Sequence, residues 1–179
     1  MRSLVGILLL TVVISGCSNS GRFSAESDNL PAPLEIIAAE GVSIPVYDFN
    51  SFSPYLDRNN DTIYIINFWA SWCKPCIQEM PEFIELAETY KHKPVKLILV
   101  SLDFYNSVNE RLIPYIRDNH IREQVVLLND PDADAWIGKV DTTWTGSIPA
   151  TLIYHKEKRY FFEKQMSFNE LESIIKTNL

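Results

Sequence analysis

Apolar and polar positions divide the chain after residue 35 into buried strands and amphipathic helices. Residues 62–69 are a continuous β-branched and aromatic run without polar alternation, which is typical of a strand covered on both faces. Residues 73–90 carry apolar side chains at helical spacing and predict a helix that bends at Pro81, because the apolar pattern continues beyond it. Residues 95–100 predict a second buried strand.

The middle of the chain predicts one further helix and a short strand. Ser107 and Glu110 have the spacing of a capping box, so a helix is expected from Ser107 to about Asn119. Residues 125–128 predict a short strand, and residues 130–145 a loop with a short helix. These elements continue the alternation of strand and helix.

The last third predicts a hairpin and a final helix. Residues 150–154 and 159–163 are apolar runs separated by about four residues, which suits a β-hairpin. Its turn contains no glycine, so we expect a turn longer than the usual Asp-Gly type. Ser167 and Glu170 form a second capping box, which predicts a C-terminal helix.

The order of these elements predicts an α/β fold in three layers. A strand or hairpin carrying Val46, Phe49 and Phe52 is expected to precede them. Alternating strands and helices build a parallel sheet, and the hairpin adds an antiparallel edge, so the central sheet is mixed and helices cover both faces. A chain of 179 residues, 46% of them hydrophobic, is sufficient for one such domain, which we place at 35–179.

The first residues predict targeting instead of fold. Arg2 precedes an apolar run over residues 4–14, which is shorter than the roughly 20 residues of a membrane-spanning helix. The run ends in Ser15-Gly16-Cys17, which resembles a bacterial lipobox. We therefore expect a signal peptide over 1–16, lipidation at Cys17, and a polar tether over 17–34. Alternatives are an ordinary secretory signal with an unpaired thiol, or a short uncleaved anchor.

The net charge excludes one class of partner. The formal charge is −7, so electrostatics gives no reason to expect nucleic-acid binding, which requires clustered lysine and arginine. Lipidation at Cys17 instead implies contact with a membrane, on its extracytoplasmic side.

Cys73 and Cys76 carry the candidate chemistry. Their Cys-x-x-Cys spacing at the predicted start of a helix sets Cys73 where free backbone donors and the helix dipole favour a thiolate. Cys76, about one turn later, can resolve the mixed disulfide that Cys73 forms with a substrate. A zinc site would need about four ligands, and the three histidines have no ligand spacing, so no metal is expected. A purely structural disulfide is the other alternative; so short a loop would contribute little.

The motif around this pair resembles a known family. Residues 67–76, Asn-Phe-Trp-Ala-Ser-Trp-Cys-Lys-Pro-Cys, followed by Glu79-Met80-Pro81, are similar to the membrane-tethered thioredoxin-like disulfide reductases of the TlpA and ResA group. The resemblance implies a thioredoxin-like fold and a redox-active Cys73–Cys76 disulfide. It also implies that Glu79 tunes the pKa values of the two thiols and helps to handle a proton on Cys76. The alternative for Glu79 is a solvated helix charge.

A second segment of the resemblance lies near the C-terminus. Residues 146–151, Gly-Ser-Ile-Pro-Ala-Thr, match the family's substrate loop, so the Ile148–Pro149 bond is expected to be cis and Ile148 to offer its backbone to an extended substrate. Trp72 is expected to border the substrate surface, whereas Trp69 is expected in the core. Trp136 and Trp144 receive no assignment.

The resemblance implies reduction of protein disulfides outside the cytoplasm, with cytochrome c maturation as one setting. The dithiol itself carries the electrons, so no cofactor is expected, and a membrane electron donor must re-reduce it. The apolar Ile148 favours reduction over oxidation. Open alternatives are a disulfide-donating oxidase, a less favoured peroxidase, and a non-catalytic binding or chaperone lipoprotein of the same fold.

Overall fold

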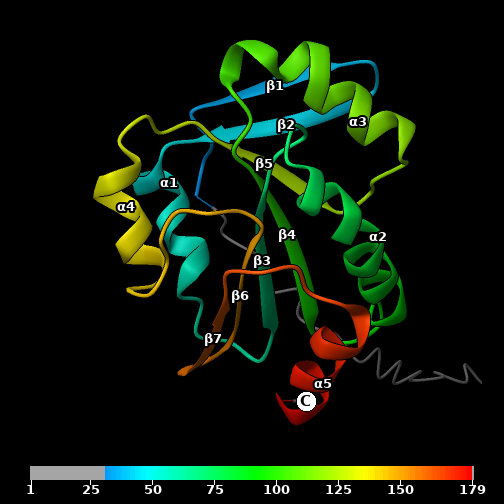
Figure 1. Cartoon of the computed structure of the whole chain (residues 1–179), viewed down its shortest axis with the longest axis vertical. Coiled ribbons are helices and arrows are strands. Elements are labelled where there is room, and N and C mark those ends of the chain that lie inside the picture. The colour runs from blue at the N-terminus through cyan, green and yellow to red at the C-terminus, as the bar shows by residue number, and fades with distance from the viewer. Residues whose placement is uncertain (1–30, 179) are drawn as a thin grey trace, which may run out of the picture.

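The computed structural model describes residues 31–178, which form one mixed sheet between two layers of helices (Figure 1). Seven strands lie in the order β1-β2-β5-β4-β3-β6-β7. Neighbours among β2, β5, β4 and β3 are parallel, whereas β1, β6 and β7 each pair antiparallel. The strands are Glu35–Ala39, Val42–Tyr47, Ile63–Trp69, Val95–Ser101, Gln124–Leu128, Ala150–His155 and Lys158–Phe162. The predicted three-layer α/β fold with an antiparallel hairpin at its edge is confirmed.

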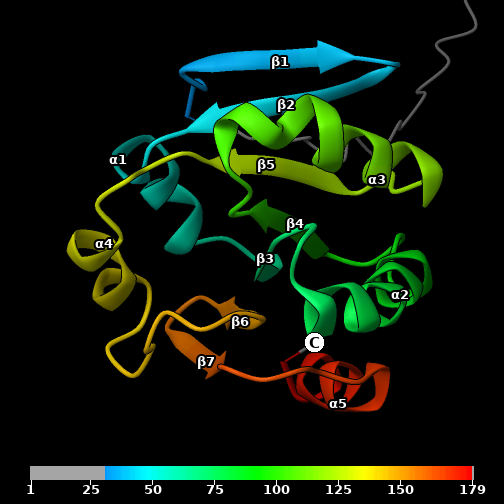
Figure 2. The same cartoon turned by 45° about the horizontal axis from the view of Figure 1, so that its top comes forward.

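The helices cover the two faces unequally (Figure 2). α2, α3 and α5 pack on one face, and α1 and α4 on the other, each over its own apolar cluster. Their bounds are Phe49–Phe52, Lys74–Thr89, Ile113–Asp118, Ala133–Val140 and Phe168–Asn178 for α1 to α5. Short 3-10 turns over Ser53–Leu56 and Tyr105–Ser107 complete the helical segments, together with a π turn over Val108–Leu112.

The central strand β3 explains why the sequence lacked alternation there. All seven of its residues are buried, because helices cover both faces and strands β4 and β6 pair with both edges. Trp69 ends this strand with no exposed surface, as predicted. α2 continues through Pro81, also as predicted, because its apolar face packs on the sheet on both sides of the proline.

The entry region differs from the prediction. β1 and β2 do form a hairpin, through Glu40 and Gly41 in left-handed conformations, but Phe49 and Phe52 lie on α1 and not on a strand. Asp48 caps α1 by accepting the Ser51 N–H at 2.8 Å. The two phenylalanines sit three residues apart, which turns both toward the second apolar cluster.

The two capping boxes had different outcomes. At Ser167 the box forms, since the Ser167 N–H donates to Glu170 at 2.9 Å and the Glu170 N–H points back to Ser167 Oγ at 3.4 Å. Ser107 makes no side-chain cap. The chain there passes from a 3-10 turn through a π turn into α3 near Pro114, instead of forming one regular helix.

The predicted long turn between β6 and β7 is wrong. His155 pairs with Lys158, which leaves a two-residue turn of Lys156 and Glu157. Lys156 adopts the left-handed conformation that such turns use, with φ of 55°, so no glycine is required. Its Nζ also lies 2.6 Å from Asp61.

Candidate redox site

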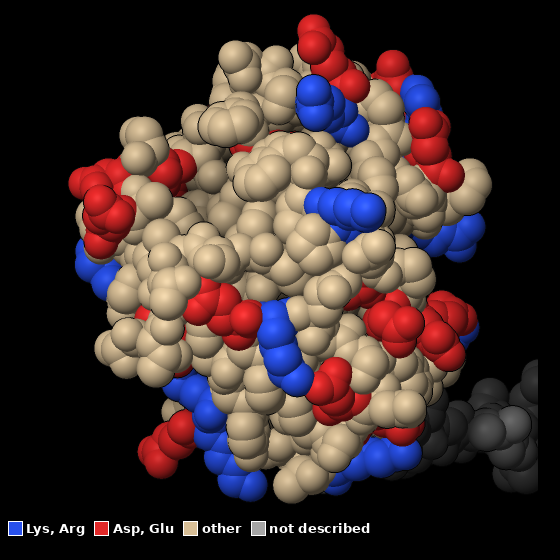
Figure 3. All heavy atoms as spheres, viewed as in Figure 1, with Lys and Arg blue, Asp and Glu red and all other residues tan. Residues whose placement is uncertain are grey.

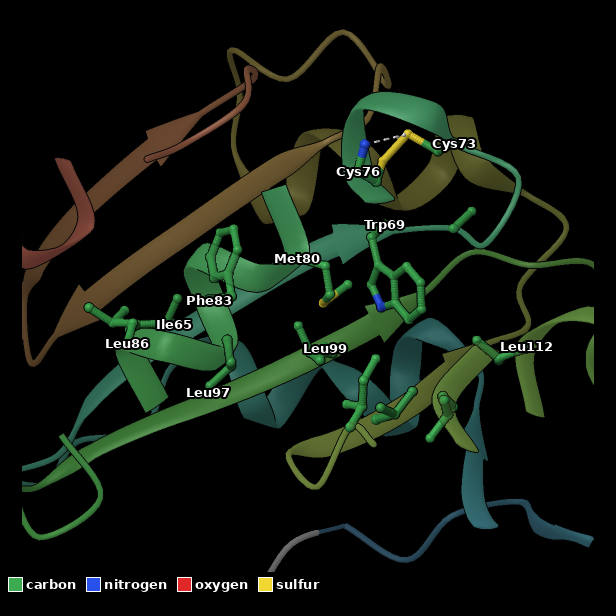
Figure 4. Close-up of a cluster of buried hydrophobic side chains, with 14 of the residues drawn as sticks. Ile65, Trp69, Cys73, Cys76, Met80, Phe83, Leu86, Leu97, Leu99 and Leu112 are labelled. Atoms are coloured by element: carbon green, nitrogen blue, oxygen red, sulfur yellow. Dashed lines mark hydrogen bonds between the residues drawn. A yellow bond between two sulfur atoms is a disulfide. The ribbon is translucent and has the colours of Figure 1, made fainter. Parts of the chain in front are cut away.

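The cysteine pair lies at the start of α2, just after the turn that connects it to strand β3 (Figure 4). Cys73 is the N-cap of α2, and its Sγ accepts the Cys76 N–H at 3.3 Å. The two sulfur atoms form a disulfide, with Cα atoms 5.3 Å apart. Cys73 keeps 5% of its surface exposed, whereas Cys76 has none. Of the two sulfur atoms, only that of Cys73 can therefore react with a group outside the protein.

The helix start explains the reactivity expected of Cys73. Lys74 and Pro75 occupy the first turn, where a proline has no helical donor to lose. Free backbone N–H groups of that turn, together with the helix dipole, stabilise negative charge on the Cys73 sulfur after reduction. Lys74 is exposed at the same end of the helix.

The second segment of the site is the loop before β6. The Ile148–Pro149 peptide bond is cis, as the family resemblance implied. The carbonyl oxygen of Ile148 lies 3.7 Å from Cys73 Sγ. Pro149 is buried and Ile148 is half-buried, so the loop presents backbone beside the exposed sulfur. An extended substrate that pairs with this backbone would bring its own sulfur to Cys73.

Glu79 is buried on α2, one turn after Cys76, with 3% of its surface exposed. Its carboxylate accepts the Asn67 side-chain amide at 2.9 Å and the Met166 N–H at 2.9 Å. Burial raises the pKa of Glu79 to about 7, and these two hydrogen bonds only partly oppose the shift. The alternative of a solvated helix charge is therefore wrong. Glu79 can gain or lose a proton near neutral pH.

Asn67 connects Glu79 to β6, the strand that follows the cis-proline loop. Its Nδ2 donates to Glu79 and also to Thr151 Oγ1 at 3.1 Å, while its Oδ1 has no hydrogen-bond partner among residues 31–178. Thr151 lies on β6, two residues after Pro149. One buried polar chain therefore runs from α2 through β3 to the strand that follows the cis bond.

Sequence reasoning missed Asp103, a buried carboxylate beside the redox turn. It accepts the Ser71 N–H at 2.9 Å, the Ser71 hydroxyl at 2.5 Å and the Ser101 hydroxyl at 2.8 Å. Ser71 lies two residues before Cys73, so Asp103 fixes the turn that presents the sulfur. The available signal was its place just after a buried strand, at the sheet edge where ligand sites of α/β proteins gather.

Aromatic side chains surround the site unevenly. Trp72 is 48% exposed and stacks on Phe104, which is 69% exposed, with ring centroids 6.4 Å apart. Trp136 and Trp144 are buried together in the second apolar cluster, with centroids 5.7 Å apart. A cavity of about 640 Å³ lies between α1, α4 and Arg159, and none of the predicted site residues lines it.

Other predicted features fall outside this site. The signal peptide of 1–16, Cys17 and most of the 17–34 tether lie outside the described residues. Among residues 31–178, no helix is long and apolar enough to cross a membrane. In the same part of the chain, no cluster of three or more histidine, cysteine, aspartate or glutamate side chains could hold a metal ion.

Comparison with known proteins supports this description. The model of the AhpC/TSA family matches residues 44–159. Thiol-disulfide oxidoreductase ResA of Bacillus cereus is 33% identical over 101 residues, which cover 54% of this chain and 53% of that protein. Sporulation thiol-disulfide oxidoreductase A of Bacillus subtilis is 28% identical over 94 residues, covering 52% and 49%. The chain thus spans about half the length of these relatives.

Solved structures agree in fold. A thiol:disulfide interchange protein from Chlorobium tepidum superposes with a TM-score of 0.55 at 20% identity, covering 85% of this chain and 99% of that one. A DsbF homologue from Corynebacterium diphtheriae gives 0.56 at 20% identity, covering 81% and 85%.

Proposed function

Because this chain belongs to the AhpC/TSA family, we propose that it is an extracytoplasmic thiol-disulfide oxidoreductase that reduces disulfides of substrate proteins. The observation that carries the proposal is the position of Cys73. Its sulfur caps α2, keeps some exposure, and lies 3.7 Å from the Ile148 carbonyl oxygen, whereas Cys76 is fully buried behind it. The names of the curated relatives support the same chemistry.

The reaction proceeds in two displacements. In the reduced protein, the Cys73 thiolate attacks one sulfur of a substrate disulfide, and the other substrate sulfur leaves as a thiolate that takes up a proton. The Cys76 thiolate then attacks Cys73 in the mixed disulfide, which releases the second substrate thiol and forms the Cys73–Cys76 disulfide. Two electrons have passed from the dithiol to the substrate.

Glu79 handles the proton of the second displacement. Cys76 must lose its proton before it attacks, and Glu79 lies one turn away with a pKa of about 7. A carboxylate with that pKa is partly ionised at neutral pH and can accept a proton without holding it tightly. Asn67 and Met166 orient it from both sides.

The cellular setting follows from the N-terminal sequence. Lipidation at Cys17 would anchor the domain to a membrane through the tether of residues 17–34, and a membrane electron donor would return the Cys73–Cys76 disulfide to the dithiol. Cytochrome c maturation is one pathway that needs such reduction. Replacement of Cys17 by alanine should abolish incorporation of labelled fatty acid; continued labelling would contradict the anchor.

Trapping tests the function directly. A Cys76→Ala variant, isolated from its own cells, should accumulate disulfide-linked partners because the mixed disulfide cannot resolve. A Cys73→Ala/Cys76→Ala variant should hold none. Absence of adducts, together with no reduction of disulfides in vitro, would leave only a non-catalytic binding role.

The direction of the reaction is set by the reduction potential. A value near about −270 mV, like that of thioredoxin, supports a reductase, whereas one near about −120 mV marks a strong oxidase. Equilibration of the purified domain with glutathione or dithiothreitol buffers measures it. We expect the lower value.

A further inference from the structure

We propose that a cavity beside the redox turn binds a large apolar side chain of the substrate protein, from a residue close to the cysteine that Cys73 attacks. The cavity has a volume of about 450 Å³, within the usual range for ligand pockets. It is bounded by residues 102–105 after β4, residues 128–131 at and after the end of β5, α4, and Trp144 with Gly146. The inference rests on the proposed function and specifies its substrate.

The cavity walls connect to both segments that flank the Cys73 sulfur. On one side Phe104 lines the cavity and stacks on Trp72, the neighbour of Cys73. On the other side Gly146 lines it, two residues before Ile148, whose carbonyl oxygen is 3.7 Å from the sulfur. A substrate chain docked at Cys73 therefore runs past the mouth of the cavity.

Hydrogen bonds hold these walls to the redox site. Trp144 donates its indole N–H to the Ser147 carbonyl at 2.9 Å, which ties one wall to the cis-proline loop. Asp103 lines the cavity and holds Ser71 through two hydrogen bonds. An extended chain advances about 3.3 Å per residue, so a side chain two to three residues from the substrate cysteine lies about 7 to 10 Å from it.

The lining favours an apolar guest. Phe104 and Tyr105 are 69% and 45% exposed at the rim, and the exposed Trp72 stacks on Phe104, so exposed aromatic surface is concentrated here. Trp136 and Trp144 are buried in the wall, and the Trp136 indole N–H has no hydrogen-bond partner among the described residues. Exposed aromatics around a hollow are the groups that anchor a partner's side chain.

Charge defines the rest of the guest. Among residues 31–178, no lysine or arginine lines the cavity, whereas Asp103 and Asp130 do, and Asp132 and Asp134 are exposed on or next to α4. Figure 3 shows acidic side chains gathered at the edge of this face over α4. A lysine or arginine next to the apolar residue of the substrate would face these carboxylates.

Peptides carrying one activated cysteine provide the test. Each octapeptide contains a single cysteine in mixed disulfide with thionitrobenzoate. Cys73 attacks the peptide sulfur and expels the coloured thionitrobenzoate thiolate, and Cys76 then releases the peptide as a thiol and leaves the protein disulfide. The protein is reduced with dithiothreitol and desalted beforehand. In the set, a single phenylalanine moves through the three positions on each side of the cysteine in an otherwise alanine and serine background.

We expect one phenylalanine position to raise the second-order rate constant of thionitrobenzoate release in this single turnover about tenfold over that of the alanine peptide. Phe104→Ala and the cavity-filling Ala133→Phe should each lower that ratio to about threefold or less. Ile36→Ala is the matched control, because Ile36 is similarly exposed at 59% but lies on the edge strand β1; it should keep the ratio. Melting curves by circular dichroism establish that the variants are folded.

A second peptide pair tests the charge. With phenylalanine at the preferred position, a neighbouring lysine should be favoured over glutamate by about threefold, and D132K/D134K should reverse the preference. No preference for phenylalanine at any position, or a preference that Phe104→Ala and Ala133→Phe leave intact, would overturn the subsite. If the wild type releases thionitrobenzoate from none of the peptides, the proposed function itself is refuted.

Discussion

Two buried carboxylates, Asp103 and Glu79, lie near the redox pair and differ in the groups that they bind. Asp103 receives three hydrogen bonds, two from Ser71 before Cys73 and one from Ser101. Glu79, after Cys76, receives two, and burial raises its pKa to about 7. Both side chains are 3% exposed. Equal burial therefore has two consequences: Asp103 fixes the backbone of the redox turn, whereas Glu79 has a pKa near neutral pH, which suits the proton exchange that we propose for it.

The largest effect should come from removing the Asp103 carboxylate. Asp103→Ala removes the acceptor of the partly buried Ser71 N–H and hydroxyl and of the buried Ser101 hydroxyl, at a cost of about 1 to 3 kcal/mol for each donor that finds no other partner. We expect a loss of about 3 kcal/mol or more in urea unfolding of the oxidised protein. Asp103→Asn keeps one acceptor oxygen and should lose less stability. Equal stability of both variants and the wild type would contradict the role of Asp103 in holding the redox turn.

The stability of the wild type should depend on pH through Glu79. Its pKa is about 7 in the folded state against an ordinary 4.5, so the folded protein binds this proton more tightly than the unfolded chain does. The resulting stabilisation is complete below pH 4.5 and is lost as the pH rises through 7. The loss is on the order of 3 kcal/mol, from about 1.4 kcal/mol per pKa unit.

Comparison with Glu79→Gln isolates that contribution. The difference in unfolding free energy between wild type and Glu79→Gln, measured by urea titration from about pH 4 to 9, should change in favour of the variant as the pH rises. Asn67 can turn its amide so that Oδ1, unpaired in the wild type among the described residues, accepts from the introduced glutamine amide. A difference that stays constant with pH would mean that Glu79 titrates normally.

Kinetics should separate the two carboxylates further. In Glu79→Gln the resolving attack by Cys76 lacks its proton acceptor, and we expect it to slow by about 10²-fold at neutral pH. The rate of peptide release from a preformed Cys73 mixed disulfide measures this step. In the wild type, this release rate plotted against pH should show an inflection near pH 7, from the titration of Glu79. The inflection should vanish in Glu79→Gln and persist in Asp103→Asn. Loss of the inflection in both would place the proton exchange elsewhere.

The smallest effect distinguishes the two serines that bind Asp103. Ser71→Ala and Ser101→Ala each remove one hydroxyl donor, for about 1 kcal/mol of stability. Only Ser71 belongs to the turn before Cys73, so only Ser71→Ala should shift the reduction potential, measured in dithiothreitol buffers. Equal shifts in both variants would contradict a specific effect of the Ser71 contact on the redox pair.

Local sequence patterns determined much of this protein. The run over residues 62–69, the helical spacing after Cys73 and the box at Ser167 each contain their own signal, because burial on both faces, amphipathicity and capping are set by residues a few positions apart. The family resemblance correctly implied the cis bond before Pro149. Local signals failed where they conflicted with tertiary packing: Phe49 and Phe52 joined a helix because the second apolar cluster holds them, and Ser107 capped nothing.

Only the tertiary structure decided what surrounds the sulfur atoms. Asp103 meets Ser71 because β4 pairs with β3 in parallel register, which brings the ends of two strands together across 32 residues of sequence. Glu79 acquires its raised pKa from burial in the folded protein, and the hydrogen bonds from Met166 and Asn67, 87 and 12 residues away, only partly oppose this shift. The sequence by itself identified the reactive pair and its helix. The dielectric, the hydrogen bonds and the cavity beside that pair depend on distant segments, which no local pattern records.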